Sequence, residues 1–506
     1  MFDLKKMKNF LIAKGMEKAL PWLSDNSPET LIKLIDMMRV RGIERMKAYH
    51  KGTEAELARR VEGANAFFEM VKRNLPKYSH ATQRNLAYNF YYNALTSGEE
   101  IREEYFKRNG EYPPFFLAIS PSMACNLRCF GCYAWKYPKE KSLSKEKVSA
   151  IIKEAKEKMG IYFVTITGGE PTFWPPLEEI IREHNDVFFH IYTHGMNIDE
   201  ATAKRWAEYG NVHASISIEG NEELTDARRG KGAYQKITAS MRRLRDAGCM
   251  FGFSITHTRK NHEVVCSGKY MDEMIENGCS YGWFFQYQPI GKEPDLDLCP
   301  TAQQRWERRE AVLRFRREKP ILTYDFWNDG DSCEGCIAWG RKYVHVTAQG
   351  LVEPCVFVHF AVDSIHEKSL EECINSPCFK EARCRQPFTK DLRSPCPQID
   401  QGYHLKELVE KYHMKPTHEG AERIVTDLYD TVTKMSKEYQ AILPKDDGAI
   451  KTKMSSEDNK GGNGIAHEVT KEQLDSIKNV DVPMRDEIIA SKGKCECCQD
   501  CNCDKK

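Results

Sequence analysis

The chain lacks the features of a membrane-spanning or nucleic-acid-binding protein. No apolar run approaches the length of a membrane-spanning helix, and the mean hydropathy is -0.61. Neither sign of charge is in excess, since 75 Lys and Arg face 74 Asp and Glu, so no global field recruits nucleic acid or an acidic membrane. The N-terminus shows no secretory signal pattern. We therefore expect a cytoplasmic protein without a nucleic-acid partner.

Cysteine is also missing, but only from the first 111 residues. The chain contains 19 cysteines, most of them clustered after that point. Clustered thiols in a large chain without a secretion signal favour metal sites in a reducing compartment over disulfides. The cysteine-free part has apolar residues at helical spacing, as in residues 28–38 and 64–75, which predicts a helical domain. Its first segment is basic and amphipathic, so peripheral membrane contact is an alternative to core packing.

From residue 115 onward, predicted strands alternate with predicted helices. Strands are expected at residues 115–119, 162–167, 187–193, 212–218, 250–255 and 281–286. Helices are expected between them, for example from Ser144 as a cap to Met159, with Gly160 as the stop. This alternation favours a parallel sheet with helices outside, in which chemistry gathers at the carboxyl ends of the strands.

Three cysteines follow the first predicted strand. Cys125, Cys129 and Cys132 have the spacing C-x3-C-x2-C in the loop after that strand. A cubane iron-sulfur cluster normally takes four thiolates, so a loop that supplies three leaves one iron open to bind a substrate. A zinc site or buried thiols are the alternatives.

This spacing, with Tyr133 directly after the third cysteine, resembles the signature of the radical S-adenosylmethionine (SAM) superfamily. In that family the open iron of a [4Fe-4S] cluster binds the amino and carboxylate groups of SAM, and reduction of the cluster cleaves SAM to a 5′-deoxyadenosyl radical. The resemblance implies an α/β fold with a partial (β/α)6 TIM-type barrel. It also implies the [4Fe-4S] cluster and SAM as cofactors, and a small electron donor such as ferredoxin or flavodoxin as a partner.

A second motif follows the second predicted strand. Residues 167–171 read Thr-Gly-Gly-Glu-Pro and are similar to the family's GGE motif. The likeness implies that Gly168, Gly169 and Glu170 hold the ammonium group of SAM. We expect the two glycines to let the backbone approach this ligand closely.

Two further turns resemble the family with departures. Residues 193–195 read Thr-His-Gly where the family has Thr-Asn-Gly, and we interpret His194 as a loop residue rather than a base. A later turn reads Ser-Ile-Glu-Gly and resembles the family's Ser-x-Asp-Gly motif, which implies that Glu219 contacts the SAM ribose. An exposed acid at a turn is the alternative reading of Glu219. Arg229, or its neighbour Arg228, is expected near the SAM carboxylate.

A second group of cysteines begins at residue 333. Cys336 and Cys355 flank a predicted hairpin with its turn at residues 348–350, and their Cys-x13-Gly-x4-Cys pattern resembles the SPASM and twitch extensions that bind auxiliary iron-sulfur clusters. The run C-x2-C-x5-C, which holds a second cluster, is absent, so we expect one auxiliary cluster. The metal ligands implied here are Cys333, Cys336, Cys355, Cys384 and Cys396. A zinc-bound structural knuckle is the alternative.

Substrate contacts are expected on the later strands. By position the candidates are Thr256, His257, Gln286 and Tyr287, whereas the aromatic residues 283–285 are interpreted as core. No residue is assigned a catalytic role.

Four isolated cysteines, Cys249, Cys266, Cys279 and Cys299, have no metal-like neighbours in the sequence and are interpreted as small buried hydrophobes. Cys279 lies nearest a strand end and is the candidate if the reaction needs a hydrogen-atom donor. Farther on, residues 446–494 are typical of a linker or disorder. Five thiols in residues 495–503 fit metal binding or a tail without a catalytic role.

The sequence predicts five regions. They are a helical N-terminal domain (1–111), a radical SAM partial barrel (112–300), a small cysteine-rich α+β extension of SPASM or twitch type (301–400), C-terminal helices (401–445), and a flexible linker with a cysteine-rich tail (446–506).

The resemblance implies a radical SAM enzyme that modifies an unactivated carbon of a peptide or protein substrate, which the SPASM-like extension favours. The first alternative is a lipid-modifying radical SAM enzyme that forms a carbon-carbon bond or adds an adenosyl group. It is suggested by the amphipathic first segment and by a short likeness around Cys336 and Cys355 to hopanoid-modifying enzymes. The second alternative is a non-catalytic iron-sulfur scaffold or electron carrier, against which the glycine-rich SAM loop argues.

Overall fold

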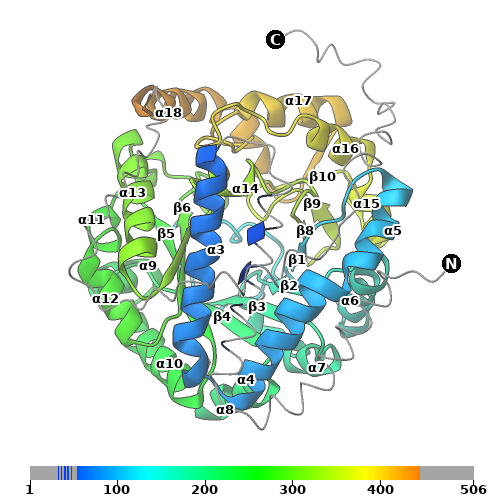
Figure 1. Cartoon of the computed structure of the whole chain (residues 1–506). Helices are drawn as coiled ribbons and strands as arrows, with labels where there is room; N and C mark the ends of the chain where they lie inside the picture. The colour runs from blue at the N-terminus through cyan, green and yellow to red at the C-terminus, as the bar shows by residue number, and fades with distance from the viewer. Residues whose placement is uncertain are drawn as a thin grey trace, which may run out of the picture. The chain divides into compact units, whose positions relative to one another are not determined.

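A ten-stranded sheet lies at the centre of the computed structural model (Figure 1). The structure describes residues 54–444 and, before them, Ile32, Asp36, Arg39, Val40, Ile43, Glu44 and Lys47. The predicted amphipathic first segment, the linker and the cysteine-rich tail lie outside the described residues. The predicted division into five regions stays a prediction.

The strand order is β11-β9-β8-β1-β2-β3-β4-β5-β6-β7, and the run from β8 through β1 to β7 is parallel. A second sheet pairs β10 with β12. The strands are β1 Phe116–Ile119, β2 Phe163–Ile166, β3 Phe188–Thr193, β4 Val212–Ser217, β5 Phe251–His257, β6 Tyr281–Gln286, β7 Leu322–Asp325, β8 Tyr343–Val346, β9 Leu351–Glu353, β10 Phe360–Ala361, β11 Asp363–Ser364 and β12 Lys415–Pro416.

Helices cover the outside of this sheet, as the α/β alternation predicts. The α-helices of the described residues are α3 Glu54–Asn74, α4 His80–Asn85, α5 Glu99–Asn109, α6 Lys145–Met159, α7 Leu177–Glu183, α8 Glu200–Tyr209, α9 Glu222–Arg229, α10 Ala233–Ala247, α11 His262–Val265, α12 Gly268–Glu276, α13 Ala302–Glu318, α14 Gly330–Cys333, α15 Leu370–Ile374, α16 Pro377–Cys384, α17 Gly402–Tyr412 and α18 Tyr429–Ile442. Between α4 and α5 the chain forms a π-helix, η2 Leu86–Ser97.

The predicted α/β barrel is confirmed, since all six predicted strands form with ends shifted by at most two residues. Helix α6 shows why local prediction succeeds. The Ser144 hydroxyl accepts a hydrogen bond from the Lys147 backbone N–H, and Gly160 ends the helix in the left-handed region at φ 63°. Its apolar residues recur at helical spacing and are buried against the sheet.

Two strands extend the predicted set of six. β7 adds to β6 at one edge, and β8 pairs in parallel with β1 at the other, in the register Phe116 to Tyr343. The predicted hairpin is confirmed as β8 and β9, but its pairing with β1 has no signal in the sequence. This pairing puts the second cysteine group beside the strand that precedes the first.

Helical segments before β1 cover the amino end of the barrel. Met70 and Val71 of α3 pack with Phe188, Met250 and Tyr281, which lie at or next to the amino ends of β3, β5 and β6. In Figure 1, α3 runs in front of the sheet up to α14, with which it is in contact.

Three asparagine side chains also hold the helical segments before β1 against the amino end of the barrel. The side-chain amides of Asn85, Asn89 and Asn93 each donate to backbone carbonyls of the loops before β3 and β4, with N–O distances of 2.8–3.2 Å. The predicted helical prefix is therefore docked by polar contacts as well as apolar ones.

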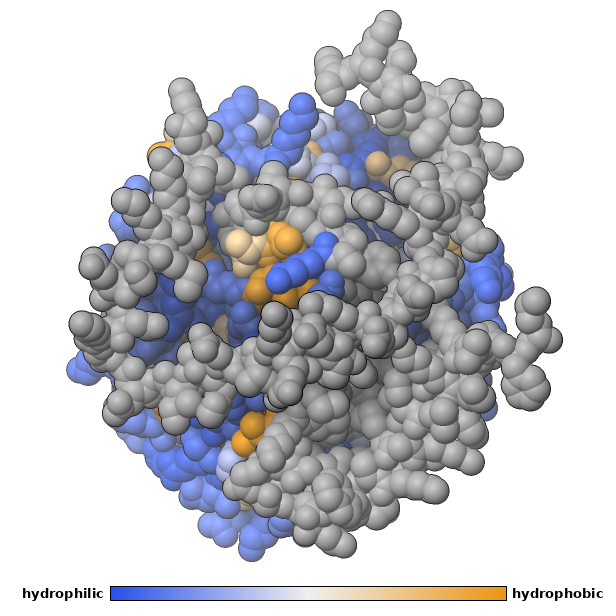
Figure 2. Space-filling view, in the orientation of Figure 1, coloured by the Kyte–Doolittle hydropathy of each residue, from blue (hydrophilic) through white to orange (hydrophobic). Residues whose placement is uncertain are grey.

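The described surface in the view of Figure 2 is mainly hydrophilic, with hydrophobic side chains near its centre. Among the described helices, none is both long and apolar enough to cross a bilayer.

Candidate active site

The first cysteine loop is held by the segment after β2. The Gly169 N–H donates to the Ser122 carbonyl over 3.1 Å, and the Glu170 N–H donates to the Ala124 carbonyl over 2.8 Å. A Cβ atom on Gly169 would lie 2.3 Å from the Ala124 oxygen, so any side chain there would push the loop away. The structure therefore gives the glycine a role that the sequence did not predict, because its close approach is to the cysteine loop itself.

Glu170 is buried at the carboxyl end of the barrel and lines the cavity described below. One carboxylate oxygen accepts from the Thr172 N–H (3.1 Å) and from the Thr193 hydroxyl (2.5 Å). The other accepts from the His194 N–H at 2.8 Å. Neutral donors surround this charge, so the carboxylate is oriented without a neutralising cation.

His194 connects Glu170 to the cysteine loop. Its Nδ1 accepts from the Met196 N–H at 3.1 Å, so its Nε2 carries the proton and donates to the Asn126 side-chain oxygen at 3.0 Å. Burial lowers the pKa of His194, which keeps the ring neutral. Because Asn126 directly follows Cys125, this bond positions the loop, in agreement with the interpretation of His194 as a loop residue.

Glu219 holds two arginines. One of its oxygens accepts from Arg228 at 2.6 Å and from Arg229 at 2.5 Å. Arg228 also donates to the carbonyl of Phe130, between the second and third cysteines, at 3.2 Å. Both arginines line the cavity, while Glu219 is 1% exposed and lies behind them. Two guanidinium groups share the one carboxylate of Glu219, so this trio carries one positive charge that suits an anionic ligand group.

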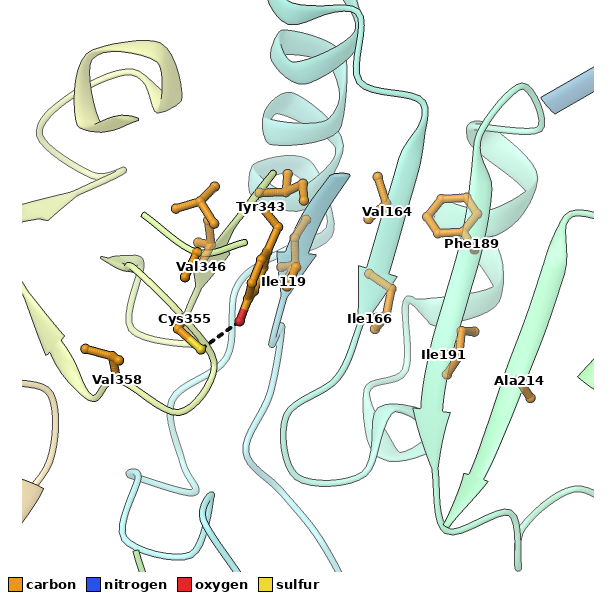
Figure 3. Packing of buried hydrophobic residues seen from close by; sticks show 14 of the residues in the cluster. Ile119, Val164, Ile166, Phe189, Ile191, Ala214, Tyr343, Val346, Cys355 and Val358 are labelled. Carbon is orange, nitrogen blue, oxygen red and sulfur yellow. Dashed lines mark hydrogen bonds between the residues drawn. The ribbon is translucent and has the colours of Figure 1, made fainter. Parts of the chain in front are cut away.

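The second cysteine group surrounds the carboxyl end of β9. The Tyr343 hydroxyl donates to the Cys355 sulfur at 2.7 Å (Figure 3). The Tyr343 ring stacks on that of Phe116 of β1, with centroids 4.8 Å apart. Arg341 donates to the carbonyls of Cys333 and Cys336 at 2.8 and 2.7 Å. These contacts shape the Cys333–Cys336 turn and the Cys355 loop from neighbouring strands.

Helix α13 holds the remaining cysteine-bearing segments through four buried arginines. The ion pairs are Arg305 with Asp400, Arg308 with Asp325, Arg309 with Asp331 and Arg316 with Asp329, with N–O distances of 2.5–2.7 Å. Asp331 lies two residues before Cys333, and Asp400 also accepts from the Cys396 N–H at 3.1 Å. These residues were not predicted from the sequence, although the arginines at helical spacing on one face of α13 were the available signal.

Burial raises the pKa of several thiols in each group. The pKa of Cys125, Cys333 and Cys396 is about 11, and that of Cys355 about 12. These thiols are protonated at neutral pH, so a metal that binds them must displace protons.

One cavity of about 690 Å³ joins the two cysteine groups. The cysteines that line it are Cys125, Cys129, Cys132, Cys333, Cys336, Cys355 and Cys396. Cys384 is exposed and is not among the lining residues, so its predicted ligand role stays a prediction. The ring of Tyr133, which follows Cys132, lies 5.3 Å from that of Phe357, so an aromatic contact connects the two groups.

Three of the four expected substrate contacts, Thr256, Gln286 and Tyr287, line this cavity. His257 does not, because it is fully buried. The interpretation of the aromatic residues 283–285 as core is wrong for Trp283 and Phe285, which line the cavity, and right for Phe284, since alternate residues of a strand face opposite sides.

Gln288 also lines the cavity and has no sequence signal beyond its place after β6. Both polar atoms of its amide are buried without a partner among the described residues. A buried amide in this state is a group that a ligand can satisfy.

Of the isolated cysteines, Cys249, Cys279 and Cys299 are buried as expected. Cys279 lies just before the amino end of β6 and is not a cavity residue, so the structure gives no support to a role as hydrogen-atom donor. Cys266 departs from the expectation, since its sulfur lies 3.7 Å from Nδ1 of His262.

His257, His262 and Cys266 form the one trio of potential ligands within 4.8 Å of one another in the described residues. Arg308 donates to Nδ1 of His257 at 3.0 Å, so Nε2 of His257 carries a proton and donates to His262. His262 in turn donates to Glu307 at 2.8 Å. Every ring nitrogen is engaged, and this trio is a hydrogen-bond chain that fits no ion.

The two cysteine groups fit clusters better than single ions. Within the described residues, no three of their sulfurs come within 4.8 Å of one another, as the ligands of one tetrahedral zinc would. A cubane separates its ligands over four irons, and the loop of Cys125, Cys129 and Cys132 supplies three of the four thiolates that it takes.

Comparisons with known proteins agree with this site. A sequence profile of the Radical SAM superfamily matches residues 119–263, and one of the SPASM iron-sulfur cluster-binding domain matches residues 333–398. Mycofactocin maturase MftC of Mycolicibacterium smegmatis is 28% identical over 307 residues, 58% of this chain and 75% of the relative. MftC of Mycobacterium ulcerans is 30% identical over 297 residues, 56% of this chain and 78% of the relative.

Two further comparisons give more distant matches. The sporulation killing factor maturation protein SkfB of Bacillus subtilis is 25% identical over 289 residues, 53% of this chain and 66% of the relative. Among solved structures, Streptococcus suis SuiB bound to the precursor peptide SuiA superposes with a TM-score of 0.51 at 16% identity, over 64% of this chain and 79% of SuiB. At this identity the likeness concerns the fold.

Proposed function

Because this chain belongs to the radical SAM superfamily and carries a SPASM iron-sulfur domain, we propose that it modifies an unactivated carbon of a peptide or protein substrate. It is an enzyme whose cofactors are SAM, a [4Fe-4S] cluster and auxiliary iron-sulfur clusters bound by the SPASM domain. That membership excludes the reading as a non-catalytic scaffold. Support for a peptide substrate comes from a relative named as a PqqA peptide cyclase, of Gluconobacter oxydans, and from MftC and SkfB, which are named as a maturase and a maturation protein.

The observation that carries the proposal is the shared cavity. Both cysteine groups and Glu170 open on the same space of about 690 Å³, so one bound substrate has room to meet both. Aromatic side chains line part of this space, and such walls would limit the access of water to a reactive intermediate.

The residues take the following roles. Cys125, Cys129 and Cys132 would hold the [4Fe-4S] cluster, which would supply the electron chemistry for reductive cleavage of bound SAM. Glu170, held by Thr193 and His194, orients the SAM ammonium group.

The SAM carboxylate is assigned to two arginines. Arg228 and Arg229, both fixed by Glu219, provide the positive charge for it. Glu219 thus acts through the arginines, and a direct ribose contact requires that it release one of them.

The auxiliary side is assigned to four cysteines. Cys333, Cys336, Cys355 and Cys396 hold the auxiliary cluster, because these four line the cavity. A ferredoxin or flavodoxin supplies the electron.

The class of reaction is tested by anaerobic reconstitution with iron and sulfide, followed by dithionite and SAM. We expect 5′-deoxyadenosine from the intact protein and none above background from the Cys125→Ala variant. Equal amounts from both would contradict the assignment of the cluster loop.

The substrate class is tested by co-expression with short open reading frames encoded next to this chain. A peptide substrate predicts a mass decrease equal to the hydrogens lost on forming a new bond, seen only with the intact cysteine loop. A lipid is the second candidate, favoured by the apolar lining of the cavity, and a lipid extract from the same cells is compared by mass spectrometry.

A further inference from the structure

Three consecutive residues at the amino end of β8 act on the auxiliary cysteines. Tyr343 is the first residue of the strand, and Arg341 and Lys342 precede it. Tyr343 contacts Cys355, whereas the positive charges of the other two act on Cys333. None of the three is a cysteine, so their effect on a cluster held by these cysteines comes through hydrogen bonds and charge.

The proton of the Tyr343 hydroxyl is directed at sulfur. The hydroxyl oxygen accepts a hydrogen bond from the Val356 N–H at 3.4 Å and lies 2.7 Å from the sulfur of Cys355 (Figure 3). A phenol has one proton to donate, and the Val356 N–H already occupies the oxygen as a donor, so that proton goes to the sulfur. Once Cys355 binds a metal as a thiolate, this contact is a charge-assisted hydrogen bond, which is stronger than a neutral one.

The fold holds this hydroxyl in place from the side of β1. Tyr343 pairs in parallel register with Phe116, and the two rings stack with centroids 4.8 Å apart and planes 2° from parallel. Tyr343 is 2% exposed, and burial raises the pKa of its phenol, so the donor keeps its proton at neutral pH.

Positive charge adjoins Cys333. Burial raises the pKa of this thiol, and the charges of Arg341 and Lys342 oppose that effect. Two aspartates act in the same direction as burial, but each is paired with an arginine of α13. Among the described residues, no carboxylate lies within ion-pair distance of Lys342, because Glu334, which attracts it, is paired with Arg60 at 2.6 Å.

One acidic group works in the opposite direction. Glu353 lies two residues before Cys355, and its carboxylate accepts from Nδ1 of His345 at 2.7 Å and from the Tyr137 hydroxyl at 2.5 Å. This charge is present whichever side chain occupies positions 342 and 343. It therefore sets a fixed background against which the effects of those two positions can be measured.

We propose that Tyr343, through its hydrogen bond to Cys355, raises the reduction potential of the auxiliary cluster, and that Arg341 and Lys342 add to this shift by their charge. The inference rests on the proposed function, which assigns Cys355 to that cluster. A one-electron reduction adds one negative charge to the cluster and its thiolates, with the electron taken from the reductant. A hydrogen bond to sulfur and a nearby positive charge both stabilise the more negative state, so both make reduction easier.

The test is an anaerobic titration of the reconstituted holoenzyme with dithionite, followed by electron paramagnetic resonance. The auxiliary signal is the one that remains when Cys125, Cys129 and Cys132 are replaced by alanine. Tyr343→Phe keeps the stacked ring and removes the hydroxyl. We expect the equilibrium constant for reduction of the auxiliary cluster to fall at least tenfold, which is about 59 mV for one electron, with the iron content unchanged.

The matched control is Tyr78→Phe. It removes a buried hydroxyl that donates to Ser280 at 2.6 Å and does not line the cavity. The auxiliary potential of this control should equal that of the intact protein. A fall of less than tenfold in Tyr343→Phe, an equal fall in the control, or loss of auxiliary iron from Tyr343→Phe would each overturn the proposal.

The charge contribution is tested separately by Lys342→Gln. Because Lys342 is exposed, we expect a smaller fall in the equilibrium constant that shrinks as the salt concentration is raised. The fall in Tyr343→Phe comes from a buried bond and should not depend on salt. Lys204→Gln, at an exposed lysine of α8, is the control and should show no change. An unchanged potential in Lys342→Gln would overturn the charge part of the proposal.

The same protein samples separate this inference from the proposed function. If 5′-deoxyadenosine forms but Tyr343→Phe leaves the auxiliary potential unchanged, the role of the hydroxyl is overturned and the proposed reaction stands. If the potential falls as expected but no 5′-deoxyadenosine forms, the role of the hydroxyl stands and the proposed reaction fails. An auxiliary signal that persists in Cys355→Ala would contradict the assignment of this ligand and the role of the hydroxyl with it.

Discussion

The cysteine loop after β1 and the auxiliary cysteines line the same cavity but are held by different means. The loop takes its three cysteines from one short segment, docked by backbone hydrogen bonds to Gly169 and Glu170. The auxiliary cysteines come from separate segments between residues 333 and 396, tied to α13 by buried ion pairs. The first site is specified locally, whereas the second depends on the folded scaffold, and each is expected to fail in its own way.

The largest effect should come from removing the local site. Replacing Cys125, Cys129 and Cys132 by alanine should abolish SAM cleavage and lower the iron content by about four per chain, since one cubane is lost. Iron bound by the auxiliary cysteines should remain, as seen by chemical iron analysis and electron paramagnetic resonance.

The matched control is Cys373→Ala with Cys378→Ala, two buried cysteines that do not line the cavity. Loss of the auxiliary iron in the triple variant would break the comparison, because it would make the second site dependent on the first.

The second largest effect is expected at the auxiliary cysteines. Asp400→Asn leaves the Arg305 guanidinium buried without its charge partner, which should cost about 3–5 kcal/mol of the free energy of unfolding. The auxiliary iron should fall more than the iron of the cysteine loop, because Asp400 also fixes Cys396. Urea denaturation and iron analysis measure the two effects.

Asp427→Asn breaks an exposed pair with Arg423 and serves as the control, with no measurable change expected. An equal loss of both kinds of iron in Asp400→Asn would show that α13 supports the whole barrel and not the auxiliary site in particular.

A smaller effect is expected from the backbone contact of the loop. Gly169→Ala places a Cβ 2.3 Å from the Ala124 oxygen, and the shift needed should cost about 1–3 kcal/mol and weaken SAM binding. Gly63→Ala, in α3 with nothing within 4 Å, should leave SAM affinity unchanged. Equal SAM affinities of the two variants, measured by calorimetry, would show that the close contact of Gly169 is not needed for SAM binding.

The smallest effect concerns a peripheral carboxylate on α16. Burial alone would raise the pKa of Glu381, but hydrogen bonds from Lys411, Tyr412 and Arg385 lower it to about 2. A depressed carboxylate stabilises the fold above its unfolded pKa, and this contribution is lost as the pH falls through the folded value. Glu381→Gln should therefore lower the melting temperature at pH 7. The difference in melting temperature between this variant and the unchanged protein should become smaller as the pH falls from about 4.5 to about 2.

The control for this measurement is the same substitution, Glu to Gln, at the exposed Glu410 of α17. A deficit of Glu381→Gln that is constant across the pH range would assign the loss to packing rather than to charge.

Local patterns allowed a large part of the molecule to be predicted. β1 to β6, the hairpin of β8 and β9, and the cysteine loop all come from short-range periodicity, turn residues and motif spacing. The order of the motifs along the chain was enough to place Cys125 and Glu170 at the same end of the barrel.

What escaped prediction depends on partners that are distant in the chain. Arg305 at an inward position of α13 contradicts hydrophobic periodicity until Asp400 is known to face it. Similarly, Trp283 and Phe285 were interpreted as core, and only the packing of the whole barrel shows that they line the cavity. The pairing of β8 with β1 has the same origin, because it joins segments more than two hundred residues apart.

The four buried arginines of α13 limit which sequence changes this helix can accept. A residue added or removed within the helix would rotate everything after it by about 100°, because the helix has 3.6 residues per turn. Arg308, Arg309 and Arg316 would turn away from their aspartates together, whereas exchanges on the exposed face would leave every pair in place. The length of α13 is therefore far less free to vary than its composition, and an alignment of related chains should show many substitutions there but no gap.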